Sequence, residues 1–143
     1  MDETLIVIME KNKETGFLEK ELGSYAVSDE LQVYLYNTYA ESDESGSFTV
    51  FMKLTCPSEV EDWEYSAIFD YYDTETFSPF VSSIIEDDDN YNPTWIVSFD
   101  FSEDISVMEE KIEAILSCHK TELDSVFEAI ADKKDEYISH EKI

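Results

Sequence analysis

The last third of the sequence carries apolar residues at steps of three or four, and neither Gly nor Pro interrupts residues 104–135. The recurring residues are Ile105, Met108, Ile112, Ile115, His119, Leu123, Val126 and Ile130, with Leu116 and Phe127 widening the stripe. This period is typical of an amphipathic helix whose apolar face lies against a core. We therefore expect a helix over 104–135, or two helices if the chain bends near Ser117. Its cap is expected at Ser102 or in a Ser106–Glu109 capping box.

The first 102 residues read instead as strands joined by polar turns. Segments rich in β-branched and aromatic residues alternate with clusters of Asn, Asp, Ser, Gly and Pro, which is the pattern of hairpins. The three expected hairpins join Leu5–Met9 to Phe17–Val27, Leu31–Tyr36 to Phe48–Thr55, and Phe80–Glu86 to Thr94–Phe101. Gly23, inside the second of these segments, is expected to mark a bulge.

The segment between residues 58 and 72 fits two patterns. Ser58-x-x-Glu61 has the form of a capping box that would open a short helix. Aromatic and apolar residues nevertheless fall at every second position from Trp63 to Tyr71, which is the period of a half-buried strand. We favour a strand that begins at about Trp63.

Strands followed by a helix predict an α+β fold. We expect an antiparallel sheet of about six to seven strands, with the long C-terminal helix, or two helices, packed on one face. The other face is expected to carry the excess carboxylates and exposed aromatic residues. A single domain would span residues 1–137, with strands mainly in 1–102 and the helix in 104–135, and residues 138–143 would form a frayed tail.

Acidic residues outnumber basic ones by 35 to nine, and because every basic residue is Lys, the chain has no Arg and a formal net charge of −26. Such a charge keeps a protein soluble, attracts basic protein surfaces and repels nucleic acids and anionic lipids. We expect no direct nucleic-acid or membrane partner. The absence of Arg also argues against chemistry on phosphate groups, which Arg binds in bidentate fashion.

The chain shows no feature of export. Its apolar run Leu5–Met9 is short and follows Asp2 and Glu3, where a signal peptide would carry positive charge. We therefore expect a cytoplasmic protein in which Cys56 and Cys118 stay reduced.

No catalytic constellation is visible, so we predict that the protein is not an enzyme and has no catalytic residue and no cofactor. Cys118 and His119 are neighbours, but on a helix they would point about 100° apart and make a poor dyad. His119 lies on the apolar stripe, which favours a buried core residue, and His140 lies in the expected tail.

Two acidic clusters resemble divalent-cation ligands. They are Asp87-Asp88-Asp89-Asn90 and the set of Asp70, Asp73 and Glu75. Neither follows the spacing of a calcium-binding loop, so we interpret the first as a solvated turn and the second as a strand end, and predict no metal site. An enzyme that uses surface carboxylates and a divalent cation remains an alternative.

The acidity instead favours a binding protein of unknown role that engages a basic protein surface. The residues predicted to contact such a partner are Glu59, Glu61, Glu64, Asp70, Asp73, Glu75, Trp63 and Tyr72. If residues 63–72 form a strand, alternate side chains lie about 6.6 Å apart, close to the spacing of nucleic-acid phosphates, so the protein could act as a nucleic-acid mimic or inhibitor.

Two further functions fit the same residues. An immunity- or antitoxin-like inhibitor would meet a basic toxin through complementary charge, with aromatic anchors such as Trp63, Tyr71 and Tyr72. An oligomeric structural module, such as a homodimer, would use the aromatic segment 63–72 as its subunit interface.

Three stretches carry a family resemblance: Thr15–Tyr25, Val60–Asp73 and Tyr91–Trp95. They resemble an uncharacterised family of small acidic proteins from clostridia and related anaerobic Firmicutes. The resemblance runs over most of the chain and includes Glu122–Ile130. It implies a cytoplasmic bacterial setting, and it assigns no activity and no site residue.

Overall fold

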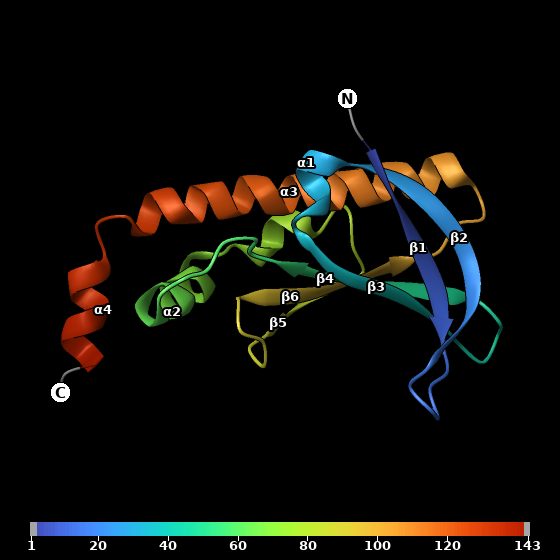
Figure 1. Cartoon of the computed structure of the whole chain (residues 1–143), viewed down its shortest axis with the longest axis horizontal. Helices are drawn as coiled ribbons and strands as arrows, with labels where there is room; N and C mark the ends of the chain where they lie inside the picture. The colour runs from blue at the N-terminus through green and yellow to red at the C-terminus, as the bar shows by residue number, and fades with distance from the viewer. Residues whose placement is uncertain (1–2, 142–143) are drawn as a thin grey trace.

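Six strands form one sheet, and a long helix lies along one face of it (Figure 1). The structure is a computed structural model that describes residues 3–141. The elements are β1 (Glu3–Lys11), β2 (Leu18–Ser28), α1 (Asp29–Gln32), β3 (Leu35–Ser42), β4 (Phe48–Thr55), α2 (Asp62–Tyr71), the 3₁₀ turn η1 (Thr74–Phe77), β5 (Ser83–Asp87), β6 (Thr94–Asp100), α3 (Ile105–Ile130) and α4 (Lys134–Glu141).

The strand order is β2-β1-β3-β4-β6-β5, and every neighbouring pair is antiparallel except β1 and β3. The three predicted hairpins are present as β1–β2, β3–β4 and β5–β6. The predicted α+β fold, a mostly antiparallel sheet followed by a long C-terminal helix, is therefore confirmed.

The core lies between α3 and the sheet. Side chains alternate along each strand, so every second residue of β4 and β6 points towards the helix. The buried residues of this layer are Val50, Met52 and Leu54 of β4, Trp95, Val97 and Phe99 of β6, and Met108, Ile112, Ile115, Leu116, Leu123, Val126 and Ile130 of α3. The apolar stripe that predicted the helix is thus the stripe that the sheet covers.

The predicted bulge lies in the first hairpin. Ile8 pairs with Gly23 and Met9 pairs with Glu21, so Leu22 is the extra residue. A Cβ on Gly23 would stand 2.5 Å from the hydroxyl of Tyr25, a buried residue. Gly23 is therefore needed because the Tyr25 ring folds back over the backbone at this point.

The strand predicted from Trp63 is wrong, because this segment forms the helix α2. A capping box opens it, but at Glu61 and Glu64 and not at Ser58 and Glu61. The buried residues Trp63, Ala67 and Ile68 follow a helical spacing, so one side of α2 packs on the core. Aromatic residues on both sides of this helix had produced the alternating pattern.

The C-terminal helices also differ from the prediction. Asp104 is the N-cap of α3, and its carboxylate accepts from the backbone N–H groups of Ser106 at 2.9 Å and Val107 at 3.4 Å. The helix runs through Ser117 without a break and ends at Ile130. The predicted tail is partly helical as well, since α4 extends to Glu141, and residues 142–143 lie outside the described part.

A short helix, α1, replaces the start of the strand predicted from Leu31, and β3 begins only at Leu35. Leu31 is buried in α1, where it joins the core. The chain therefore makes this short helix beside α3 before it enters β3, inside the sheet (Figure 1).

The face of the sheet opposite α3, here called the open sheet face, is not the carboxylate-rich surface that we expected. Its centre is apolar and consists of Leu5, Val7 and Met9 of β1, Tyr39 of β3, Phe51 of β4, Ile96 of β6 and Ile85 of β5. The carboxylates on this face lie at strand ends, as Glu41, Asp87 and Asp100 do, or on the edge strand β2, where Glu21 pairs with Met9. The remaining carboxylates lie on helices, loops and edges.

Candidate functional site

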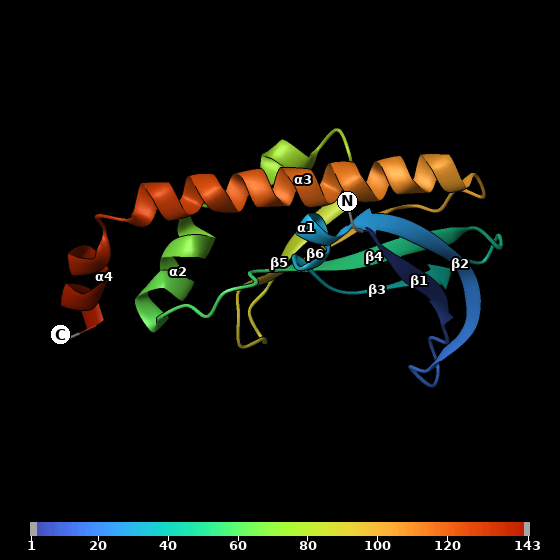
Figure 2. The same ribbon diagram turned by 45° about the horizontal axis from the view of Figure 1, so that its top comes forward.

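The helices α2 and α4 and the C-terminal part of α3 meet at one end of the molecule, away from the β1–β2 hairpin (Figure 2). The Tyr137 hydroxyl of α4 donates to Asp70 of α2 at 2.7 Å, and Lys134 Nζ lies 3.8 Å from Glu61 Oε2. We use the name acidic helical end for the carboxylates of this region together with those of the adjoining turn η1, which contacts the middle of α3 through Thr76 and Cys118 (Figure 2). They are Glu59, Glu61, Asp62, Glu64, Asp70, Asp73, Glu75, Glu122, Asp135 and Glu136. All six acidic residues predicted to bind a partner belong to it.

The two predicted aromatic contacts do not lie on the surface of this end. Trp63 and Tyr72 are only 7% and 6% exposed, so they pack in the core and are not available as anchors. The indole Nε1 of Trp63 donates to Glu61 Oε2 at 2.8 Å, and its ring lies 6.2 Å from the ring of Tyr137. Trp63 therefore positions the carboxylate of Glu61 at the start of α2 and packs against Tyr137 of α4.

Several of the predicted carboxylates have structural partners. Glu64 Oε1 accepts from the backbone N–H of Glu61 at 2.8 Å, and Asp73 Oδ1 accepts from that of Glu75 at 3.0 Å. Burial, together with the hydrogen bond to Asp70, raises the pKa of Tyr137 to about 12, so its hydroxyl stays a donor over the physiological range. These carboxylates are fixed in place by the fold.

Between residues 59 and 75, three other carboxylates of the acidic helical end are left for a partner, and Asp135 and Glu136 of α4 are likewise exposed without a side-chain partner among the described residues. Glu59, Asp62 and Glu75 are exposed, and their side chains form neither a hydrogen bond nor an ion pair with any described residue. Sequence reasoning had missed Asp62, because the assumed strand hid its position at the start of a helix. On α2, Asp62, Ser66 and Asp70 are spaced by four residues and share one exposed side, with a rise of about 6 Å per step.

A buried polar network lies beneath this end. The Tyr72 hydroxyl is 2.7 Å from His119 Nδ1, and His119 Nε2 is 2.8 Å from the carbonyl oxygen of Thr55. A carbonyl oxygen only accepts, so Nε2 carries the proton and Nδ1 accepts from Tyr72. The ring of Trp95 stacks on Tyr72 at 4.1 Å and meets His119 edge-on at 5.3 Å. The network joins α3 to β4 and to the segment after α2.

His119 is a core residue, as its place on the apolar stripe predicted. It is fully buried, and burial lowers its pKa to about 4 despite the opposing effect of the Thr55 carbonyl. Both ring nitrogens of His119 form hydrogen bonds. The Sγ atom of the neighbouring Cys118 lies 3.5 Å from Thr76 Oγ1. The poor dyad predicted for Cys118 and His119 is confirmed, because the two side chains serve different contacts. Nothing in the sequence indicated that Tyr72 is the hydrogen-bond partner of His119.

The buried histidine makes stability depend on pH. Its pKa in the folded protein, about 4, is below the ordinary value of 6.5, so below pH 6.5 the unfolded chain binds a proton that the folded protein excludes. We expect this group to contribute full stability above pH 6.5 and to lose about 2 kcal/mol of it between pH 7 and pH 5. Urea unfolding at both pH values, compared with the variant His119→Gln, measures this difference.

The variant provides the control because the carboxylates of both proteins titrate alike, and Gln retains an amide that can donate to the Thr55 carbonyl. An equal change in the free energy of unfolding for both proteins would contradict the prediction. Ring-proton NMR gives a second measurement, in which His119 should remain neutral down to about pH 5.

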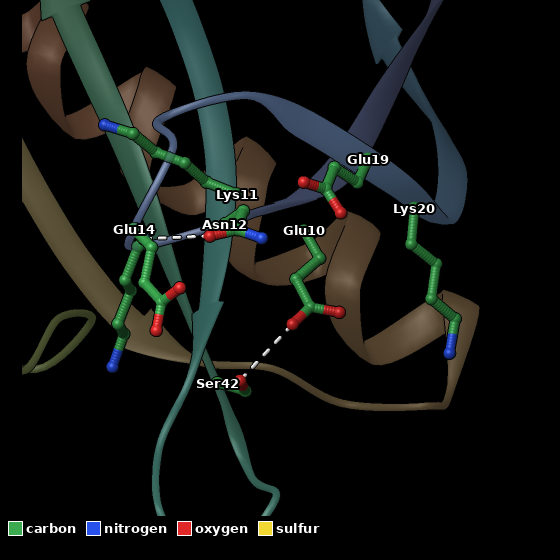
Figure 3. Close-up of a pocket in the computed structure, with 8 residues that line it drawn as sticks. Glu10, Lys11, Asn12, Glu14, Glu19, Lys20 and Ser42 are labelled. Atoms are coloured by element: carbon green, nitrogen blue, oxygen red, sulfur yellow. Dashed lines mark hydrogen bonds between the residues drawn. The ribbon is translucent and has the colours of Figure 1, made fainter.

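A hollow of about 600 Å³ lies beside the β1–β2 turn. It is lined by Glu10, Lys11, Asn12, Lys13, Glu14, Glu19, Lys20 and Ser42. Figure 3 shows that the side chains of Lys11 and Lys20 point away from each other, with the carboxylates of Glu10 and Glu19 between them. Ser42 donates to Glu10 at 3.3 Å. Three of the nine lysines therefore line this hollow, but carboxylates separate Lys11 from Lys20, so the lysines form no cradle for an anion (Figure 3).

The two acidic clusters considered as cation ligands are separate local structures. Asp87 Oδ2 lies 3.9 Å from Lys53 Nζ, and Asp87 Oδ1 accepts from the backbone N–H of Asp89 at 3.3 Å, as in a polar turn. Asp70 and Asp73 hold Tyr137 and the start of η1. Among residues 3–141, no three His, Cys, Asp or Glu side chains are placed to share a metal ion.

Comparisons with known proteins give one match. The model of a family described as a family of unknown function (DUF6762) covers residues 1–138. No curated protein and no solved structure matches the chain. Within the described residues, no helix is both long and apolar enough to span a bilayer.

Proposed function

We propose that this chain, which belongs to the DUF6762 family of unknown function, is a non-enzymatic binding protein whose acidic helical end engages a basic protein surface. The observation that carries the proposal is the set of exposed carboxylates Glu59, Asp62 and Glu75, which lie just before α2, at its start and in η1, and form no ion pair with a lysine of the described residues. An immunity- or antitoxin-like inhibitor would be one form of this function.

The ordered backbone around these carboxylates lowers the free-energy cost of binding a partner. The buried Trp63 and Tyr72, the Glu61–Glu64 capping box and the Asp70–Tyr137 hydrogen bond already order the backbone that carries the free carboxylates. A basic partner then meets charges whose positions are set before contact, so less conformational entropy is lost on association. The net charge of −26 adds a long-range attraction that speeds the encounter.

The helical form of residues 62–71 changes how this surface works. The phosphate-like row that we expected required a strand, and residues on α2 instead point around a helix axis. We therefore do not propose nucleic-acid mimicry. We propose instead that Glu59, Asp62 and Glu75 recognise the basic partner. Lysine or arginine side chains spaced by about one helical turn would complement Asp62 and its neighbours.

The proposal is tested by removing charge locally. The triple variant Glu59→Gln, Asp62→Asn, Glu75→Gln should bind about tenfold more weakly to the basic protein that the wild-type chain captures from host lysate, measured calorimetrically with both proteins purified. The matched control is Glu14→Gln, Glu44→Gln, Glu103→Gln, which removes the same charge from exposed residues elsewhere.

The control separates a specific surface from general acidity. If both triple variants weaken binding equally, only the total charge matters and the acidic helical end is not the site. Raising NaCl from 50 to 500 mM should weaken the wild-type complex, because it screens attraction between exposed charges. Binding that ignores both salt and the first triple variant would contradict the proposal.

A further inference from the structure

The open sheet face exposes more apolar surface than a solvent-facing sheet normally does. In antiparallel sheets with one covered face, the residues on the uncovered face are usually polar. Here Leu5 is 68% exposed, Ile85 58% and Val7 42%. Between them the half-buried rings of Tyr39 and Phe51 stack at 5.2 Å, and Ile96 pairs directly with Ile85, so apolar residues lie on this face from β1 to β5. Exposed apolar residues gathered on one face are typical of interaction surfaces.

The charge on this face differs from that of the rest of the molecule. Two of the nine lysines lie on it: Lys11 Nζ stands 4.6 Å above the Tyr39 ring, and Lys53 Nζ is 3.9 Å from Asp87 at the rim. The central residues Tyr39, Phe51 and Ile96 have no carboxylate as a cross-strand partner, since Glu41, Asp87 and Asp100 lie at strand ends and Glu21, which pairs with Met9, lies on the edge strand β2. A basic partner would therefore bind elsewhere on the molecule, so a partner of the open sheet face must be acidic or neutral.

We propose that the open sheet face binds the same face of a second copy of this chain. Two copies, each with a net charge of −26, repel one another over most of their surface. Their contact is least unfavourable where carboxylates are sparse and lysines are present, and this face meets that condition. An isologous contact also pairs one apolar sheet with another, about 10 Å apart as in a sandwich.

The edge of the sheet at β2 supports face-to-face over edge-to-edge contact. The backbone N–H of Ala26, on this edge strand, donates to Glu109 Oε2 of α3 at 2.6 Å. A neighbouring strand would have to displace this bond to pair with β2. The aromatic segment 63–72, which the alternative of an oligomeric module would use as its interface, buries Trp63 and Tyr72 and exposes Tyr71, so we favour the open sheet face.

Sedimentation equilibrium of the full chain at 10 μM to 1 mM tests the proposal. We expect a monomer–dimer equilibrium that strengthens at least threefold between 50 and 500 mM NaCl, because salt screens the repulsion between the two acidic copies. This salt dependence is opposite in sign to that expected for a basic partner, so failure of one proposal is distinguishable from failure of the other.

Variants locate the interface. Leu5→Glu and Ile85→Glu each place a charge on the open sheet face and should weaken dimerisation at least tenfold. The matched control is Ile105→Glu at the start of α3, where a residue of similar exposure, 59%, lies off this face. Circular dichroism should show that all three variants fold, since each replaced side chain is exposed.

Three results would overturn the proposal. The chain could remain monomeric at 1 mM in 500 mM NaCl, which would leave this face to a different partner. The dimer could weaken as salt rises, or Ile105→Glu could weaken it as much as Leu5→Glu and Ile85→Glu do.

Discussion

Replacing Trp95 with alanine is expected to lower the free energy of unfolding by about 3–5 kcal/mol, the range for aromatic residues deleted from a core. Trp95 is fully buried on β6, stacks on Tyr72 at 4.1 Å and lies 5.2 Å from the ring of Phe69. Its removal leaves a cavity between the sheet, α2 and the His119 network. Chemical denaturation monitored by circular dichroism measures the loss.

Trp95→Phe is the matched control for this variant. The indole N–H is buried and donates to no described residue, so phenylalanine breaks no hydrogen bond of the protein and keeps most of the ring. We expect it to cost less than half as much as alanine. Equal costs for the two variants would mean that the surrounding aromatic residues do not pack as the structure shows.

Replacing Ser117 with proline is expected to cost about 3 kcal/mol or more, because α3 is continuous at this residue. Proline removes one hydrogen bond of the helix and its ring clashes with the carbonyl group four residues earlier, at Glu113. Ser117 is exposed, so loss of packing contributes little. Unfolding measurements and far-ultraviolet circular dichroism report the loss of stability and of helix.

Ser117→Ala separates the backbone effect from the loss of the hydroxyl. Alanine favours a helix by roughly 0.5 kcal/mol over serine, so this variant should be as stable as the wild type or slightly more stable. If proline at this position cost less than 1 kcal/mol, the helix would bend at Ser117, as the alternative interpretation of the sequence allowed.

The long helix and the three hairpins could be predicted because each leaves a local pattern. The stripe from Ile105 to Ile130 has one period over 26 residues, and turn residues bound each pair of strands. Residues 63–71 were predicted wrongly because their aromatic side chains pack in several directions. The ring of Trp63 packs against Tyr137, whereas that of Phe69 packs against Trp95. The sequence of this short segment therefore fitted both the helical and the strand period.

The candidate site was predictable in part. The six acidic residues proposed from the sequence all lie at the acidic helical end, because they are close together in the chain. Their separation into structural carboxylates and free ones was not predictable, since it depends on Tyr137, Lys134 and backbone groups that the fold brings to them. The N-cap of α3 was not predictable either, because neighbouring polar residues differ little in capping free energy. Asp104 caps the helix, where the sequence had suggested Ser102.

The net charge of −26, the absence of Arg and the strand-then-helix order are properties of the chain before it folds, and they were enough to predict the fold class and an acidic surface. The Tyr72–His119 pair joins residues 47 positions apart, and the open sheet face gathers residues from five strands. Such arrangements arise only when distant segments pack, because local patterns record which side of an element is apolar and not which element covers it. The contrast between an acidic helical end and an apolar sheet face is therefore a consequence of the tertiary fold.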